Sequence, residues 1–137
     1  MLNKIIFAGR ITADPELKST GNQVSVVSFS VAVERNIKDK DGNRAVDFIP
    51  VTAWRHTAEF ICKYFRKGQM ILILGELQSR KYEDKDSGKT RTAWEVIASE
   101  AHFCGGSEKA ESGEKESGGG DGAVFEDVTN YGDDLPF

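Results

Sequence analysis

Long apolar runs and a cysteine framework are both missing from this chain of 137 residues. No run approaches the roughly eighteen apolar residues that a membrane-spanning helix needs. Residues 2–9 are too short an apolar stretch for a secretory signal. The two cysteines, Cys62 and Cys104, lie 42 positions apart and indicate no disulfide framework. We therefore expect a soluble protein of a reduced, cytoplasmic compartment, with no membrane partner.

Catalytic and metal-binding motifs are missing as well. The chain contains no Gly-x-Ser-x-Gly or His-Glu-x-x-His sequence and no convincing pair of acidic residues. Gly88-Lys89-Thr90 resembles the end of a phosphate-binding loop, but Glu83 stands where that loop needs a glycine. Four residues could serve as zinc ligands, but their spacing fits no zinc finger or knuckle: His56, Cys62, His102 and Cys104. The sequence predicts neither an enzyme nor a cofactor or metal site.

Charge divides the chain into two parts. Residues 105–137 contain nine acidic and two basic residues, which leaves +3 on residues 1–104 although the whole chain carries −4. The same segment holds eight of the 14 glycines and cannot bury enough apolar surface to offset the entropy lost on ordering it. We expect a folded domain over residues 1–104, a disordered acidic linker over 105–132 and a short tip at 133–137.

Residues 46–68 change their hydrophobic period partway and anchor the predicted fold. The first nine alternate as in a β-strand, so small aliphatic side chains share one face while Phe48 and Trp54 stand on the other. Gly68 is expected to end the helix that follows, with Arg66 near its negative end. That helix is indicated by four residues at the spacing of one helical face: Ala58, Ile61, Cys62 and Phe65.

Four further stretches have the patterns of strands: residues 2–11, 24–35, 70–82 and 90–103. The first has apolar residues on both faces, which implies that protein covers both. Three strands, one short helix and two more strands predict an all-β fold, a closed five-stranded barrel of the OB type. The hairpin of residues 70–103 is expected to project from the barrel as an arm.

Three aromatic residues are candidates for stacking on nucleic-acid bases: Phe48, Trp54 and Tyr82. Every base offers a π-face, and each stack on an aromatic ring contributes about 1–3 kcal/mol. The alternative is that these rings pack across the barrel or in an oligomer interface. Trp94 shares a face with Val96 and Ala98, which predicts a core or interface position for it.

Basic residues at strand ends and on the arm are candidate phosphate contacts. A nucleic-acid backbone would run along these positions, although ordinary solvated charge is the alternative for each residue. The candidates are Arg10, Arg35, Arg55, Arg80, Lys81, Lys89 and Arg91.

Several of these segments resemble bacterial single-stranded DNA-binding proteins. Residues 3–10, followed by Asp14-Pro15-Glu16, look like the opening of that family. Residues 64–68 resemble the end of its helix, and residues 80–82 resemble its arm. The last five residues, 133–137, are similar to its C-terminal tip. The likeness runs through the whole chain in order.

The resemblance implies an OB fold, assembled as a homotetramer around which single-stranded DNA wraps. It puts Phe48, Trp54 and Tyr82 at positions where family members stack aromatic rings on bases, and another family aromatic falls near Ile37. It implies a non-enzymatic, nucleoid-associated role in which the tip recruits replication, recombination and repair proteins. The residues of that tip are Asp133, Asp134, Leu135, Pro136 and Phe137.

Two other functions stay open on the sequence. An RNA-binding OB protein, like a cold-shock domain, would keep the fold and change the ligand. An assembly or adaptor protein would bury its outward aromatics at an interface and act only through its tip.

Overall fold

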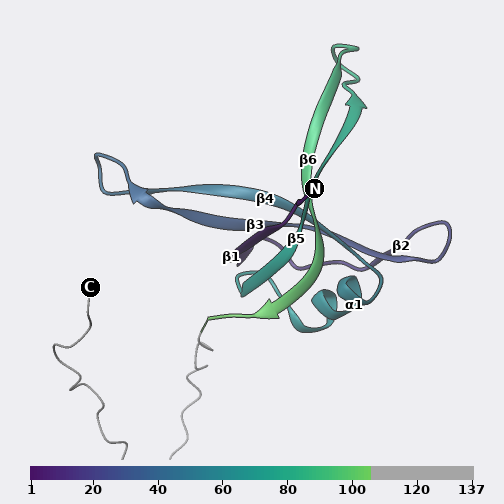
Figure 1. Cartoon of the computed structure of the whole chain (residues 1–137), viewed down its shortest axis with the longest axis horizontal. Helices are drawn as coiled ribbons and strands as arrows, with labels where there is room; N and C mark the ends of the chain where they lie inside the picture. The colour runs from purple at the N-terminus through teal and green to yellow at the C-terminus, as the bar shows by residue number, and fades with distance from the viewer. Residues whose placement is uncertain (106–137) are drawn as a thin grey trace, which may run out of the picture. The chain divides into compact units, whose positions relative to one another are not determined.

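The computed structural model describes residues 1–105, which form a closed five-stranded barrel with one helix (Figure 1). The all-β fold predicted from the sequence is confirmed, while the expected linker (105–132) and tip (133–137) lie, apart from residue 105, outside the described residues. The elements are β1 (Ile5–Ile11), β2 (Lys18–Ser19), β3 (Ser25–Lys38), β4 (Arg44–Trp54), α1 (Arg55–Tyr64), β5 (Met70–Glu83) and β6 (Thr90–Phe103). The two-residue β2, which pairs with β3, was not predicted.

The barrel closes because β1 pairs with two strands. It lies antiparallel to β5 over Ile5–Arg10 and then meets β3 through Arg10 and Ile11. The remaining neighbours follow in the order β5, β6, β4 and β3. Gly9 is buried at the crossing, where an added Cβ would collide with the carbonyl oxygen of Ala32 and lie 2.7 Å from a methyl group of Val31. Only a residue without a side chain lets β1 approach β3 this closely.

The core is almost entirely aliphatic. Its fully buried members come from all five barrel strands and from α1, and Phe65 is the one aromatic ring among those below 2% exposure in the described part of the chain. Burying such a side chain contributes roughly 1.5–3 kcal/mol. The alternation predicted for β4 places Val51 and Ala53 in the core and Phe48 and Trp54 on the exposed face, as observed, although Thr52 on the outer face is also buried. The aromatic residues on the outer surface therefore do not belong to the core.

The helix ends earlier than the sequence pattern predicted. α1 stops at Tyr64, and Phe65 is already extended, with φ −113° and ψ 145°, which carries its ring into the core. Arg66 does support the helix end as expected, because its guanidinium donates to the carbonyl oxygen of Cys62 at 2.7 Å. Gly68 has the expected positive φ of 85°, but it belongs to the turn after the helix.

Two β-hairpins extend beyond the barrel and point in different directions (Figure 1). β4 and β6 run parallel only where residues 51–53 meet 96–98, and they separate beyond that contact. Residues 78–95 pair only with one another and are called the β5–β6 arm from here on. The β3–β4 hairpin has a shorter loop than the predicted 36–43, since β3 continues to Lys38.

One face of β1 remains open in this chain. The strand begins at Ile5 instead of residue 2, and the Asn3 side chain continues its pairing by donating to Leu77 O at 2.9 Å and accepting from Leu77 N at 3.1 Å. Ile6 is 66% exposed, so the expectation that both faces of this strand are covered is not met within one chain. Within residues 1–105, no helix is long and apolar enough to cross a membrane.

Candidate nucleic-acid interface

Phe48 and Trp54 stand on the outer face of β4. Phe48 is 66% exposed and Trp54 is 42% exposed. At the usual rise per residue, six positions along a strand separate the two rings by roughly 20 Å. Their neighbours on β3 leave them uncovered, because Ala32 lies opposite Phe48 and small side chains continue along the strand towards Val26, opposite Trp54. Two separated aromatic surfaces are therefore presented on one strand.

Tyr82 lies on the β5–β6 arm, away from the barrel. It is 44% exposed and lies opposite Arg91 in the antiparallel register of β5 and β6. The barrel and its two projecting hairpins thus carry all three of the predicted stacking residues on open surface.

A polar network joins four strands at the fork where β4 and β6 separate. The Thr52 hydroxyl donates to Glu95 Oε2 at 2.7 Å and lies 3.2 Å from the Ser28 hydroxyl. The other Glu95 oxygen is 3.6 Å from Nε of Arg80 on β5. Thr52 is only 7% exposed, so the network fixes the junction of the two hairpins next to the aromatic face. Sequence reasoning missed it, although the alternation of β6 already put Glu95 on the outer face.

Arg55 holds an unusual backbone conformation directly after Trp54. Its φ is +54°, in the left-handed region that residues with side chains seldom adopt. Trp54 is the N-cap residue of α1 with extended dihedral angles and no side-chain capping bond. The chain therefore turns sharply from strand into helix at this point, which leaves the Trp54 ring and the Arg55 side chain exposed side by side in sequence.

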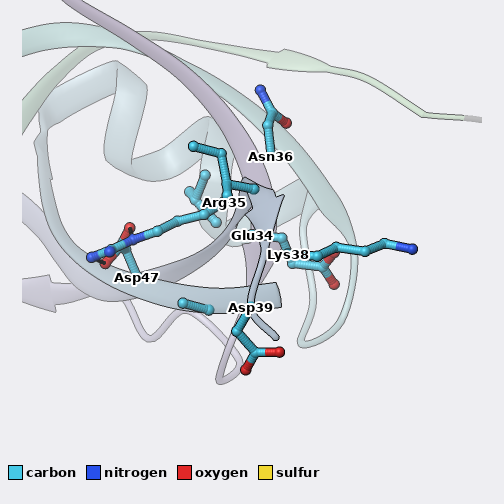
Figure 2. A pocket seen from close by; sticks show the side chains of 9 residues that line it. Glu34, Arg35, Asn36, Lys38, Asp39 and Asp47 are labelled. Atoms are coloured by element: carbon cyan, nitrogen blue, oxygen red, sulfur yellow. Dashed lines mark hydrogen bonds and ion pairs between the residues drawn. The ribbon is translucent and has the colours of Figure 1, made fainter. Parts of the chain in front are cut away.

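Arg35 is already paired with an acid. Its Nε and Nη2 each donate to one carboxylate oxygen of Asp47 at 2.8 Å, and Figure 2 shows the two groups facing each other. The hydrogen bond from Arg35 is the main cause that lowers the pKa of Asp47, and the same contact raises the pKa of Arg35. Asp47 loses its charge only as the pH falls through this lowered pKa, so the pair is intact at neutral pH.

The other predicted phosphate contacts differ in whether their charged groups already bond to another group of the protein. Arg91 pairs with Asp84 at 2.8 Å, and Arg80 lies 3.6 Å from Glu95. Arg10 donates to the carbonyl oxygen of Gly68 at 3.0 Å, which supports the turn after the helix. Three of the seven form neither an ion pair nor a side-chain hydrogen bond within residues 1–105: Arg55, Lys81 and Lys89.

A hollow lies at the end of the β3–β4 hairpin (Figure 2). The last residues of β3 line it together with Ala45 and Asp47 of β4. Ile37, near which the family resemblance puts another aromatic, lines it as well and is 83% exposed. Lys38 points away from the Arg35–Asp47 pair in this view. No group of three or more potential metal ligands occurs among the described residues.

The sequence predicted either a core or an interface position for Trp94, and the core position is wrong. Trp94 does lie on the same face of β6 as Val96. It belongs to the arm, however, where neither β1 nor β4 pairs with the ribbon, and it is 57% exposed. The alternation of side chains along β6 predicted the correct face for Trp94. It could not show where along β6 the barrel ends.

Comparison with known proteins agrees with this geometry. Residues 2–104 match the model of the Single-strand binding protein family. A protein of Caldanaerobacter subterraneus described as single-stranded DNA-binding protein is 36% identical, with all of both chains covered. One from Clostridium tetani with the same description is 39% identical over 98% of this chain and 93% of its own. A third, from Oceanobacillus iheyensis, is 40% identical over 88% of this chain and 73% of its own.

Proposed function

Because this chain belongs to the single-strand binding protein family, it binds single-stranded DNA, and we propose that it does so without marked sequence preference by stacking bases on Phe48, Trp54 and Tyr82. The observation that carries this proposal is the exposure of all three rings, each more than 40% exposed, on the outer face of β4 and on the β5–β6 arm. Stacking tolerates any sequence because every base has a π-face. The family is one of non-catalytic binding proteins, and we propose no enzymatic activity for this member.

Basic side chains supply the salt-dependent part of the affinity. Arg55 follows one stacking residue directly in the chain, and Lys81 directly precedes another, although Lys81 lies on the other face of the strand from Tyr82. Neither forms an ion pair in the described part of the chain, so neither must break one to bind a phosphate. Arg10, Arg35, Arg80, Lys89 and Arg91 complete the proposed set. Arginine and lysine contacts to a single strand release counterions, which weakens binding as salt rises.

Trp54→Ala tests the stacking proposal. The substitution removes a ring that makes no capping bond to α1, so the fold should hold. We expect affinity for poly(dT) to fall about fivefold or more, in line with the ~1–3 kcal/mol of one base stack. Trp54→Phe, which keeps a ring, should retain most of the binding. Equal affinities for wild type and Trp54→Ala, measured at low and at high salt, would contradict the proposed role of this residue.

The same titration separates the remaining alternatives. An RNA oligomer of matching sequence should bind no more tightly than the DNA oligomer, because no contact specific to the 2′-hydroxyl is proposed. Clear preference for RNA would favour an RNA-binding role, and no binding to either would leave the adaptor role.

We propose that the chain assembles as a homotetramer. Support comes from the open face of β1, where Ile6 is 66% exposed, and from the free edge of the same strand, which pairs with β5 on one side only over Ile5–Gly9. An unpaired strand edge beside an apolar face is a surface that another copy can cover. Light scattering on wild type and Ile6→Asp checks this, and a tetrameric Ile6→Asp protein would argue against the β1 face as the interface.

We propose further that the tip, Asp133-Asp134-Leu135-Pro136-Phe137, recruits replication, recombination and repair proteins, and that the protein acts in the cytoplasm on nucleoid DNA. The support is the likeness of these residues to the family's C-terminal tip, with an apolar pair at the end of an acidic segment. A synthetic peptide of residues 133–137 should compete with the whole chain for such partners. Partners that still bind the chain lacking 133–137 would speak against this role of the tip.

A further inference from the structure

The β5–β6 arm is a two-stranded ribbon with an aromatic ring on each of its faces. In an antiparallel pair, residues directly opposite each other point to the same side, and successive residues alternate. Tyr82 lies opposite Arg91 on one side, and Trp94 lies opposite Ser79 on the other. These two surfaces are called the Tyr82 face and the Trp94 face. The proposed binding mode stacks a base on the Tyr82 face, whereas it takes only Lys81 from the Trp94 face and assigns that face no stacking residue.

The Trp94 ring is accessible on its own face. It is 57% exposed, more than Tyr82 at 44% or Trp54 at 42%. The residue opposite is Ser79, whose small side chain cannot cover an indole ring, and the neighbour two positions back on β6 is Thr92. Neither β1 nor β4 pairs with this part of the ribbon. An exposed indole on a β-strand is a surface on which a flat ligand can stack.

The cations on the two faces differ in whether they are already paired. Arg80 and Arg91, on the Tyr82 face, lie 3.6 Å from Glu95 and 2.8 Å from Asp84. Lys81, on the Trp94 face, lies opposite Thr92, one row of side chains from Trp94, and forms no ion pair within residues 1–105. Glu83 lies one row further towards the arm's tip and makes no bond to Lys81. The Trp94 face thus combines an open ring with an unpaired cation at the next row.

We propose that Trp94 is a base-stacking residue for single-stranded DNA and that Lys81 contacts the adjoining phosphate, so that the arm binds DNA on its second face. This inference rests on the proposed function and deepens it. A stacking ring beside an unpaired cation is the composition of single-strand sites. The cores of protein interfaces are depleted in lysine, and here the surroundings are Ser79, Thr92 and Lys81, with Leu77 as the one partly exposed aliphatic neighbour on that face of β5. A second copy of the chain is therefore the less fitting occupant.

The test uses the fact that the chain has only two tryptophans. Trp54→Phe keeps a ring at position 54 and leaves Trp94 as the sole source of indole emission. The full-length variant is titrated with an end-labelled oligo(dT), and Trp94 emission is followed together with the anisotropy of the label. We expect the emission to fall with the same midpoint as the anisotropy rises. An unchanged emission while the anisotropy reports binding would overturn the inference and leave the proposed function intact.

Substitution at position 94 provides the second arm of the test. Trp94→Ala should weaken oligo(dT) binding about fivefold, whereas the ring-retaining Trp94→Phe should bind nearly as well as wild type. Both should melt at the wild-type temperature, because the side chain is more than half exposed. Emission from Trp94 that changes on dilution of the free protein would mark a subunit contact and overturn the inference. If the wild-type protein does not bind oligo(dT) at all, the proposed function is contradicted, and this inference fails with it.

Discussion

A basic side chain contributes to phosphate binding only to the extent that no carboxylate already neutralises its charge, and the arginines of this chain differ in this respect. Arg55 has no acidic partner in the described part of the chain, whereas Arg35 donates two hydrogen bonds, each of 2.8 Å, to the carboxylate of Asp47. Arg35 lowers the pKa of this carboxylate below its ordinary value, so the pair persists at pH values more acidic than an unpaired aspartate would allow. A strand of DNA must compete with Asp47 for this guanidinium.

Asp47→Asn should make Arg35 a better phosphate contact. The amide carries no charge, so the guanidinium can neutralise a phosphate, which releases a counterion from the DNA. We expect affinity for oligo(dT) at low salt to rise about twofold or more, and the slope of log K against log salt to steepen by about 0.7, the value for one added contact to a single strand. Titrations at several salt concentrations provide both quantities.

Asp41→Asn is the matched control, since it removes the same charge from the same hairpin without an ion pair to break. An equal gain in both variants would mean that general repulsion, rather than release of Arg35, sets the affinity. A loss of affinity in Asp47→Asn would mean that Asp47 holds Arg35 in its binding orientation.

At the scale of an element, β1 decides whether the sheet closes. Its pairing passes from β5 to β3 within two residues, Arg10 and Ile11, and the close approach just before them depends on Gly9. The hairpins that carry the rings branch from this closed barrel, so their positions rely on it. Closure is therefore a structural requirement for the binding surface, although β1 carries none of the stacking residues.

Gly9→Ala should destabilise the barrel. The new Cβ would overlap the carbonyl oxygen of Ala32 and force β1 away from β3. We expect the free energy of unfolding to fall by about 1–3 kcal/mol, as for other overpacked sites, with a lower melting temperature by calorimetry. Gly21→Ala is the control, because nothing lies within 4 Å of its added Cβ. Similar melting temperatures for the two variants would show that β1 can yield at the crossing.

The elements differ in how far sequence could predict them. Period-two alternation depends only on the backbone, so it correctly separated Val51 and Ala53 from Phe48 and Trp54. The alternation could not predict how far the barrel extends along the strands, because the exposure of Trp94 depends on where β4 stops pairing with β6.

Ion pairs were equally beyond reach. Val33 lies opposite Asp47, so Arg35 and Asp47 are diagonal neighbours on one face of the hairpin, and the periodicity of the two strands does not reveal the register that pairs them. The early end of α1 has a similar cause, since burial of Phe65 outweighed the helical pattern that continues to Gly68.

At the scale of the whole molecule, the two parts of the chain carry opposite net charge. Residues 1–104 carry +3 and residues 105–137 carry −7. DNA phosphates are attracted by the first part and repelled by the second, and both effects weaken as salt shortens the range of electrostatic forces. The overall charge of −4 therefore understates the attraction that the folded part can exert on DNA.

Removal of residues 105–137 should tighten DNA binding at low salt. The net charge changes from −4 to +3, which removes repulsion from the phosphates. We expect affinity for oligo(dT) to rise about tenfold near 10 mM salt, and the gain to shrink at 300 mM, where the Debye length is only a few ångströms. Removal of residues 133–137 alone takes away two acidic side chains and should produce a small part of this gain. Equal affinities of all three proteins would exclude the effect.

The fork at Thr52 and Glu95 also bears on the stiffness of the ligand. A strand that contacts the rings of β4 and then Tyr82 must change direction where the two hairpins separate (Figure 1). Duplex DNA has a persistence length of about 50 nm, and bending 20–30 base pairs by 40–90° costs roughly 1–6 kcal/mol. A single strand turns this corner at almost no elastic cost. If DNA binds along the proposed stacking residues, the divergence of the two hairpins would select against the double helix without contacts specific to any base.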